Sequence, residues 1–208
     1  MKSLTPPAID SAQVDAAAIR FAAAARADVR YARLDTPVGV VIAARTSAGL
    51  ARLAYEDFSG GLDAILRDLA ARLSPRILEG QAHLDPVARE LDEYFSGSRE
   101  RFDLPIDWAL VAPFGRRILE ATREIPYGNV AAYGEIAAAA GSPGGARAAG
   151  NALGANPIPI VIPCHRVVRS SGALGGYTGG IERKQALMQV EARHHPGSSP
   201  VESNQAGR

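Results

Sequence analysis

The chain of 208 residues contains a single cysteine, Cys164. A disulfide, a cysteine-rich zinc cluster and a C-x-x-C redox pair each need at least two thiols, so the sequence excludes all three. An apolar core must therefore stabilise the fold, and 47% hydrophobic residues are enough to build one. Two interpretations of Cys164 remain open at this point: an inert thiol in the core, or a reactive one.

No part of the sequence has the pattern of a secretion signal or of a membrane-spanning helix. The first 30 residues lack a basic segment followed by an apolar one, and Asp10 and Asp15 interrupt them early. The longest uncharged run, residues 148–165, contains three prolines, which are incompatible with a continuous membrane-spanning helix. We therefore expect a cytoplasmic protein without a membrane partner.

The net charge of +1 conceals an uneven distribution along the chain. Residues 1–104 carry 13 Lys and Arg against 15 Asp and Glu, whereas residues 105–193 carry 9 against 6. A basic C-terminal half hints at an anionic partner. Arginines scattered over the surface would explain the same excess equally well.

Residues 28–104 alternate between strand-like and helix-like patterns, which predicts an α+β N-terminal domain. Three short segments rich in β-branched or alternating residues are separated by turn sequences and predict a small antiparallel sheet. Helical spacing of apolar residues follows. The expected strands cover 29–34, 39–45 and 50–55, and the expected helices cover 62–73 and 86–95. Residues 1–27 are expected to form a poorly ordered extension, with a loose helix over 14–25.

Residues 105–193 predict a mostly helical C-terminal domain. Helices are expected over 113–124, 133–140, 146–154 and 183–192, each bounded by proline or glycine. The two short middle helices, joined by a glycine-containing turn, favour a helix-turn-helix. A rigid apolar segment over 158–163 leads into Cys164, and a glycine-rich loop follows over 172–180. The tail over 194–208 is expected to be disordered.

Cys164 is followed directly by His165, which changes the balance between the two interpretations of the thiol. A free thiol is only about 3% ionised at pH 7, so a reactive cysteine needs a base or a positive charge beside it. His165 supplies a base. Glu191 on the last predicted helix is a candidate to orient that imidazole, although an exposed helical glutamate is the alternative.

The helix predicted over 146–154 consists almost entirely of small residues. Ala146, Ala148 and Gly150 allow close approach to another surface, and Arg147 is the long side chain near the start of the helix. A narrow groove of DNA is one such surface, and a neighbouring helix is the other.

These residues occur in a set of motifs that resembles the O6-alkylguanine-DNA alkyltransferases, also called methylated-DNA–protein-cysteine methyltransferases. The resemblance spans residues 29–192 and is strongest from Phe114 onward. Its motifs, in order, are I-P-Y-G (125–128), Y-G-E-I-A (133–137), A-R-A (146–148), N-P-I-P-I-V-I-P-C-H-R-V-V (156–168), G-Y-T-G-G (176–180) and R-K (183–184).

The resemblance implies a ribonuclease H-like N-terminal domain and a winged-helix-like C-terminal domain. It implies direct repair of alkylated double-stranded DNA, in which O6-alkylguanine, and also O4-alkylthymine, is flipped out of the duplex. The alkyl group then passes irreversibly to Cys164, in a single turnover and without a cofactor, in a protein expected to be a monomer. Family members with an N-terminal zinc site use several cysteines there, so we expect no metal in this chain.

The resemblance also assigns roles to individual residues. Cys164 is the nucleophile, His165 takes its proton through a water, and Glu191 orients His165. Tyr133 donates toward the guanine, and Asn156 ties the recognition helix to the active-site loop. Arg147 fills the gap left by the flipped base, with the surrounding small residues entering the minor groove. The base pocket is assigned to Pro159, Val167, Tyr177 and Thr178.

Two other functions fit parts of the pattern. A non-catalytic damage-recognition protein of the alkyltransferase-like type would bind alkylated DNA but would lack the cysteine that this chain keeps. A cysteine hydrolase built on Cys164, His165 and Glu191 would need an oxyanion hole and would have no use for Arg147.

Overall fold

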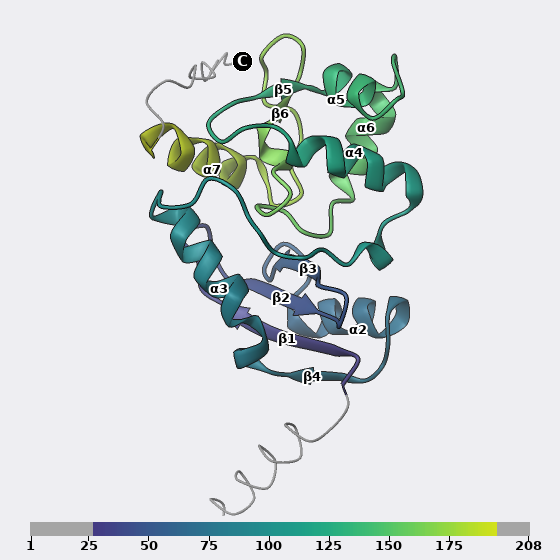
Figure 1. The fold of residues 1–208 in the computed structure, drawn as a ribbon, viewed down its shortest axis with the longest axis vertical. Helices are drawn as coiled ribbons and strands as arrows, with labels where there is room; N and C mark the ends of the chain where they lie inside the picture. The colour runs from purple at the N-terminus through teal and green to yellow at the C-terminus, as the bar shows by residue number, and fades with distance from the viewer. Residues whose placement is uncertain (1–26, 195–208) are drawn as a thin grey trace, which may run out of the picture.

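The computed structural model describes residues 27–194, which form two domains stacked along the long axis of the molecule (Figure 1). The helix expected over 14–25, most of the predicted extension and the tail after His194 lie outside the described residues. No helix within 27–194 is long and apolar enough to cross a membrane.

The N-terminal domain is built on a four-stranded sheet in the order β3-β2-β1-β4. The three predicted strands, β1 (Val29–Leu34), β2 (Val41–Arg45) and β3 (Leu50–Tyr55), pair antiparallel as expected. The expectation of a purely antiparallel sheet is incomplete, because β4 (Ile77–Glu79) pairs parallel with β1. Three residues are too few to show an alternating pattern, so sequence reasoning missed this strand.

Two helices cover opposite faces of this sheet because its strands alternate their apolar side chains. Ile42 and Ala44 belong to the smaller core, with Ile65 and Leu69 of α2 (Leu62–Arg72). The intervening residues of β2 face the larger core, to which α3 (Gln81–Phe95) contributes Leu84, Val87 and Leu91.

Helix α3 begins five residues earlier than the sequence suggested. The expected start was Pro86, since proline favours the first turn of a helix. The structure instead places Pro86 inside the helix, which begins at Gln81. Pro86 is the sixth residue of this helix, so its missing N–H leaves the carbonyl of Ala82 without its usual partner four residues later.

The C-terminal domain contains the predicted helix-turn-helix, made of α5 (Tyr133–Ala139) and α6 (Ala146–Gly154). Both helices pack against α4 (Pro113–Arg123). Two-residue strands β5 (Ala131–Ala132) and β6 (Val167–Val168) pair in parallel and so join the start of α5 to the segment after Cys164. The remaining elements are the 3-10 helices η1 (Trp108–Leu110) and η2 (Cys164–Arg166) and the helix α7 (Ile181–His194). Helix α7 is longer than predicted and includes His194, which had been assigned to the tail.

The two domains share one continuous apolar core. It runs from Leu91 of α3 to Leu187 of α7 and includes Cys164. Residues 105–107 also pair with β3, since the N–H of Leu50 donates to Pro105 O (2.8 Å) and the N–H of Asp107 donates to Leu50 O (2.9 Å). The N-terminal domain also packs against the segment that leads to the cysteine, since the N–H of Leu53 in β3 donates to Pro157 O (2.9 Å).

Candidate functional site

Asn156 fixes the loop that carries Cys164. Its side-chain oxygen accepts from the N–H of Ile158 (3.0 Å), and its Nδ2 donates both to Ile162 O (3.0 Å) and to Cys164 Sγ (3.2 Å). Between these anchors Ile160 adopts φ = 73°, a left-handed conformation that is unfavourable for a β-branched residue. The loop is therefore held in a strained shape by a buried amide at its start.

Cys164 is 5% exposed and lies at the first position of η2. Burial raises the pKa of the Cys164 thiol to about 11, and the Asn156 hydrogen bond and the Lys184 charge only partly oppose that effect. The thiol is therefore protonated at neutral pH. A reaction at sulfur needs a group that removes this proton.

His165, the next residue in the chain, is the base that the sequence predicts for this role. Its Nε2 lies 2.7 Å from Glu191 Oε1 and, because a carboxylate only accepts, Nε2 carries the hydrogen. The lone pair is then on Nδ1, which is buried and has no hydrogen-bond partner among residues 27–194. Burial lowers the pKa of His165 more than the adjacent Glu191 raises it, so the ring is a neutral base.

Glu191 is the centre of a buried polar network. Besides His165, its carboxylate accepts from Arg166 Nη2 (2.9 Å), from the Tyr94 hydroxyl (2.8 Å) and from the N–H of Gly128 (3.0 Å). Burial alone would raise the pKa of Glu191, but His165 and Arg166 outweigh it and hold that pKa well below its usual range. The carboxylate is therefore charged, as the sequence-based role of Glu191 requires.

Sequence reasoning missed two members of this network, Arg166 and Tyr94. Arg166 is 5% exposed. It follows His165 in the chain, and this position in the cysteine motif is the sequence feature that could have identified it as part of the site. Tyr94 comes from α3 of the N-terminal domain, 97 residues away from Glu191, and nothing in the sequence links the two.

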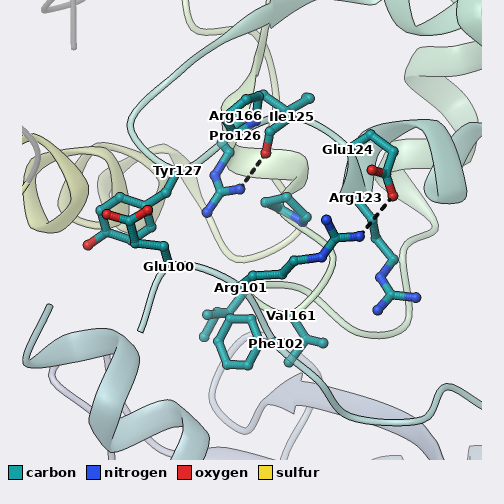
Figure 2. Close-up of a pocket in the computed structure, with 12 residues that line it drawn as sticks. Glu100, Arg101, Phe102, Arg123, Glu124, Ile125, Pro126, Tyr127, Val161 and Arg166 are labelled. Atoms are coloured by element: carbon teal, nitrogen blue, oxygen red, sulfur yellow. Dashed lines mark hydrogen bonds and ion pairs between the residues drawn. The ribbon is translucent and has the colours of Figure 1, made fainter. Parts of the chain in front are cut away.

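Arg166 also contacts the segment between α4 and β5 (Figure 2). Its Nη1 donates to Ile125 O at 2.6 Å, and its guanidinium lies 5.5 Å from the centre of the Tyr127 ring. Arg166 lines a pocket of about 220 Å³. Arg101 and Glu124, which form an ion pair (3.2 Å), line the same pocket. Cys164 does not line this pocket, so it is separate from the reactive side of the thiol.

Cys164 lines a cavity of about 460 Å³. Three residues assigned to the substrate site line it as well: Tyr133, Tyr177 and Thr178. Pro159 and Val167, which were assigned to the base pocket, are buried and do not line this cavity. Sequence reasoning also missed Phe58 of the N-terminal domain, which lines the same cavity.

A groove of about 1030 Å³ adjoins the cavity, and Tyr133 and Gly150 line both. Arg147 and Ala146 line this groove from the start of α6, and Arg169, which sequence reasoning did not select, lines it from the segment after β6. Ala148 is exposed but does not line it. Within the described residues Arg147 forms no ion pair, so its guanidinium is available to an anion.

Gly175 lies directly against the Tyr133 hydroxyl. Its φ is +66°, and a Cβ built on it would lie 2.8 Å from that oxygen. A larger residue would be strained and would displace the hydroxyl. Burial raises the pKa of Tyr133, so the hydroxyl keeps its proton and can donate it.

No group of three or more His, Cys, Asp or Glu side chains in residues 27–194 could hold a metal ion. That the site works without a metal stays a prediction from the sequence.

Two family models match the chain. The model described as the ribonuclease-like domain of 6-O-methylguanine DNA methyltransferase matches residues 29–108, and the model of its DNA-binding domain matches residues 113–193. A methylated-DNA–protein-cysteine methyltransferase of Mycobacterium tuberculosis (strain H37Rv) is 48% identical over 175 residues, which are 81% of this chain and 95% of the relative. One of Methanosarcina barkeri is 37% identical over 165 residues, 77% of this chain and 96% of the relative.

Solved structures give the same picture. The M. tuberculosis OGT in complex with DNA superposes with a TM-score of 0.69 at 36% identity, covering 80% of this chain and 95% of that one. The O6-methylguanine-DNA methyltransferase of Pyrococcus kodakaraensis superposes with a TM-score of 0.57 at 26% identity, covering 78% and 98%. The likeness therefore extends over both domains.

Proposed function

The chain belongs to the 6-O-methylguanine DNA methyltransferase family and is a DNA-binding repair enzyme that moves an alkyl group from DNA to a cysteine; we propose that Cys164 is that cysteine. The observation that carries this assignment is the shared cavity. Cys164, the only cysteine of the chain, and Tyr133 line one cavity, and Tyr133 also lines the groove that holds Arg147.

The proposed reaction is an in-line displacement at the alkyl carbon. The Cys164 proton passes through a water to Nδ1 of His165, and the thiolate attacks the carbon attached to O6. The S–C bond forms as the C–O bond breaks, and the electron pair of that bond stays on the guanine. The Tyr133 hydroxyl donates toward the guanine as this charge develops, which makes it a better leaving group. A proton then restores neutral guanine, so the overall exchange is alkyl for hydrogen.

Glu191 and Asn156 act as positioning residues in this scheme. Glu191 fixes the tautomer of His165 and stabilises the imidazolium that forms when Nδ1 takes the proton. Asn156 holds Sγ through its hydrogen bond at 3.2 Å and so orients the sulfur. The thioether product has no good leaving group, so each chain reacts once.

Reading the lesion requires the base to leave the duplex, because the alkyl carbon is out of reach inside the stack. Helix α6 supports this step, since its small residues allow close approach to a groove and Arg147 extends from its exposed face. Pro159 in the buried loop before Cys164 and Val167 in β6 do not line the cavity, and we assign them to the support of the base pocket. We extend the proposal to O4-alkylthymine, which presents the same alkyl–oxygen bond.

All the residues invoked come from one chain, so a monomer acting on alkylated duplex DNA suffices. A cytoplasmic site of action fits a single free thiol, because oxidising compartments favour disulfides.

Intact-mass spectrometry tests the assignment of the acceptor. After incubation with a duplex that contains O6-methylguanine, the protein should gain one methyl group, about 14 Da, since covalent transfer replaces the thiol hydrogen. Peptide mapping should place it on Cys164. A methyl group on any other residue, or more than one repaired base per chain, would refute the proposal.

The Arg147→Ala variant tests the base-flipping role. Unstacking a base costs a few kcal/mol, so losing the side chain that fills the gap should slow transfer from duplex DNA roughly 30-fold. Transfer from a single strand should change by less than about threefold, because an unpaired base has little stacking to lose. Arg67→Ala, an exposed arginine of α2, is the matched control. Equal losses on duplex and single strand would contradict the role.

A further inference from the structure

Phe58 is the most exposed of the large hydrophobic residues among those the structure describes, at 57%. It lies in the turn that follows β3, in the N-terminal domain, and yet it lines the cavity that contains Cys164. A single exposed apolar side chain is ordinary on a protein surface. An exposed ring at the cavity of the nucleophile is not explained by the fold, since it buries little there.

The turn that carries Phe58 is fixed to the C-terminal domain by Arg183 of α7. The guanidinium donates to Asp57 Oδ2 (2.6 Å) and to Val38 O (2.7 Å), and it lies 4.6 Å from the centre of the Tyr55 ring. Asp57 precedes Phe58 in the chain, so the ion pair between Arg183 and Asp57 lies directly beside the aromatic residue. The position of Phe58 is therefore set by contacts to the domain that holds Cys164.

Tyr55, the last residue of β3 before this turn, packs against the glycine-rich loop that also lines the cavity. The Tyr55 hydroxyl lies 3.0 Å from the Tyr177 hydroxyl. A Cβ on Gly179 would lie 2.3 Å from the Tyr55 ring, and a Cβ on Gly180 would lie 3.8 Å from the Phe58 ring. Gly179 thus allows Tyr55 of the N-terminal domain to approach this loop closely, whereas the distance at Gly180 is an ordinary contact that places the Phe58 ring beside the loop. Phe58 is therefore part of the cavity wall.

We infer that Phe58 is a specificity-determining residue, which favours O6-alkylguanines with bulky apolar or aromatic adducts over O6-methylguanine. This inference rests on the proposed function of Cys164. It is based on the observation that an exposed aromatic ring lines the cavity that contains Cys164.

The physical reason is the size of the adduct. A methyl group adds one carbon, which must lie at the sulfur during transfer. A benzyl group adds a ring that must occupy further space in a cavity of about 460 Å³, where the remaining apolar wall is formed by Leu153 and Tyr177. An apolar adduct that covers the exposed Phe58 ring removes both surfaces from water, and aromatic rings add favourable edge or offset contacts.

Single-turnover transfer rates with two substrates test the inference. The probes are identical duplexes that carry either O6-benzylguanine or O6-methylguanine. For Phe58→Ala the benzyl rate should fall about tenfold, as expected for lost contact in an apolar pocket, while the methyl rate stays within about twofold. Phe58→Leu, which keeps an apolar side chain, should recover part of the benzyl rate. Ser59→Ala, a change in the same turn, should alter neither rate.

The two substrates separate the possible failures. A methyl rate unchanged by Phe58→Ala, with methylated Cys164 as product, verifies the proposed function in the same preparation. An unchanged benzyl rate then overturns the role of Phe58. Equal losses with both substrates also overturn it, because they indicate a disturbed turn and not a contact with the adduct. Failure of the unaltered protein to methylate Cys164 would instead refute the proposed function.

Discussion

Replacing Cys164 with alanine is expected to abolish alkyl transfer completely and to leave DNA binding unchanged. The chain has no other thiol, so no second acceptor can take over. Asn156 keeps its hydrogen bonds to Ile158 and Ile162, so the active-site loop should retain its shape. Loss of one small buried atom should cost only about 1 kcal/mol of unfolding free energy. Mass spectrometry and a gel-shift titration with O6-methylguanine DNA measure the two properties separately.

Cys164→Ser is the companion variant. It keeps the size and the position of the nucleophile but replaces a thiol with a hydroxyl, which is far harder to ionise. We expect no detectable transfer from this variant either, together with unchanged thermal stability. Methylated protein recovered from Cys164→Ala would show that another side chain accepts the group and would exclude the proposed mechanism.

Glu191→Gln should have the largest effect on stability. Glu191 is 2% exposed, and its charge balances the buried guanidinium of Arg166. Removing one partner of a buried ion pair leaves the other uncompensated, which costs about 3–5 kcal/mol. Transfer should also slow at least about 100-fold, because the tautomer of His165 is no longer fixed and its imidazolium is no longer stabilised. Chemical denaturation and single-turnover kinetics measure these losses.

Glu120→Gln is the control for Glu191→Gln. Glu120 is exposed on α4 and pairs with Arg116 within one turn of the helix (2.8 Å). Exposed pairs of this kind contribute about 0–1 kcal/mol, so the control should be nearly as stable as the unaltered protein. Similar destabilisation by both substitutions would mean that the buried network around Glu191 contributes no more to the unfolding free energy than an exposed ion pair does.

The cost of Glu191→Gln should depend on pH in a predictable direction. The pKa of Glu191 in the folded protein is well below its ordinary value of 4.5. As the pH falls below that value, the unfolded chain binds a proton at Glu191 while the folded protein does not, so the unaltered protein loses stability. The variant lacks this contribution. The difference in unfolding free energy between the two should therefore be largest near pH 7 and shrink below pH 4.5.

Much of the fold follows from local sequence. The strands β1 and β3 were predicted with their observed bounds because their residues alternate between two faces, and the helix-turn-helix was marked by the glycines and the proline between α5 and α6. Errors arose where local signals were short or ambiguous. Strand β4 has three residues, and Pro86 marks the interior of α3 and not its start.

The sequence by itself determined the family to which this protein belongs and predicted its chemistry. One cysteine beside a histidine indicates the proposed nucleophile and its proposed base, and the ordered motifs favoured alkyl transfer over a cysteine hydrolase or a non-catalytic damage-recognition protein. The Cys–His pair and the motifs can be recognised in the sequence because their residues are neighbours in the chain or have a fixed order along it.

Only the tertiary structure decided what surrounds that chemistry. Tyr94 contacts Glu191 across 97 residues, and Arg183 holds the turn of Phe58 across 126. Each contact joins the two domains, and it exists because the strands and helices pack around one shared core. A sequence pattern shows where a helix or a strand forms and which of its faces is apolar. Which elements then lie in contact is decided by how these faces pack in the folded molecule. The contribution of the N-terminal domain to the active site therefore became visible only in the folded molecule.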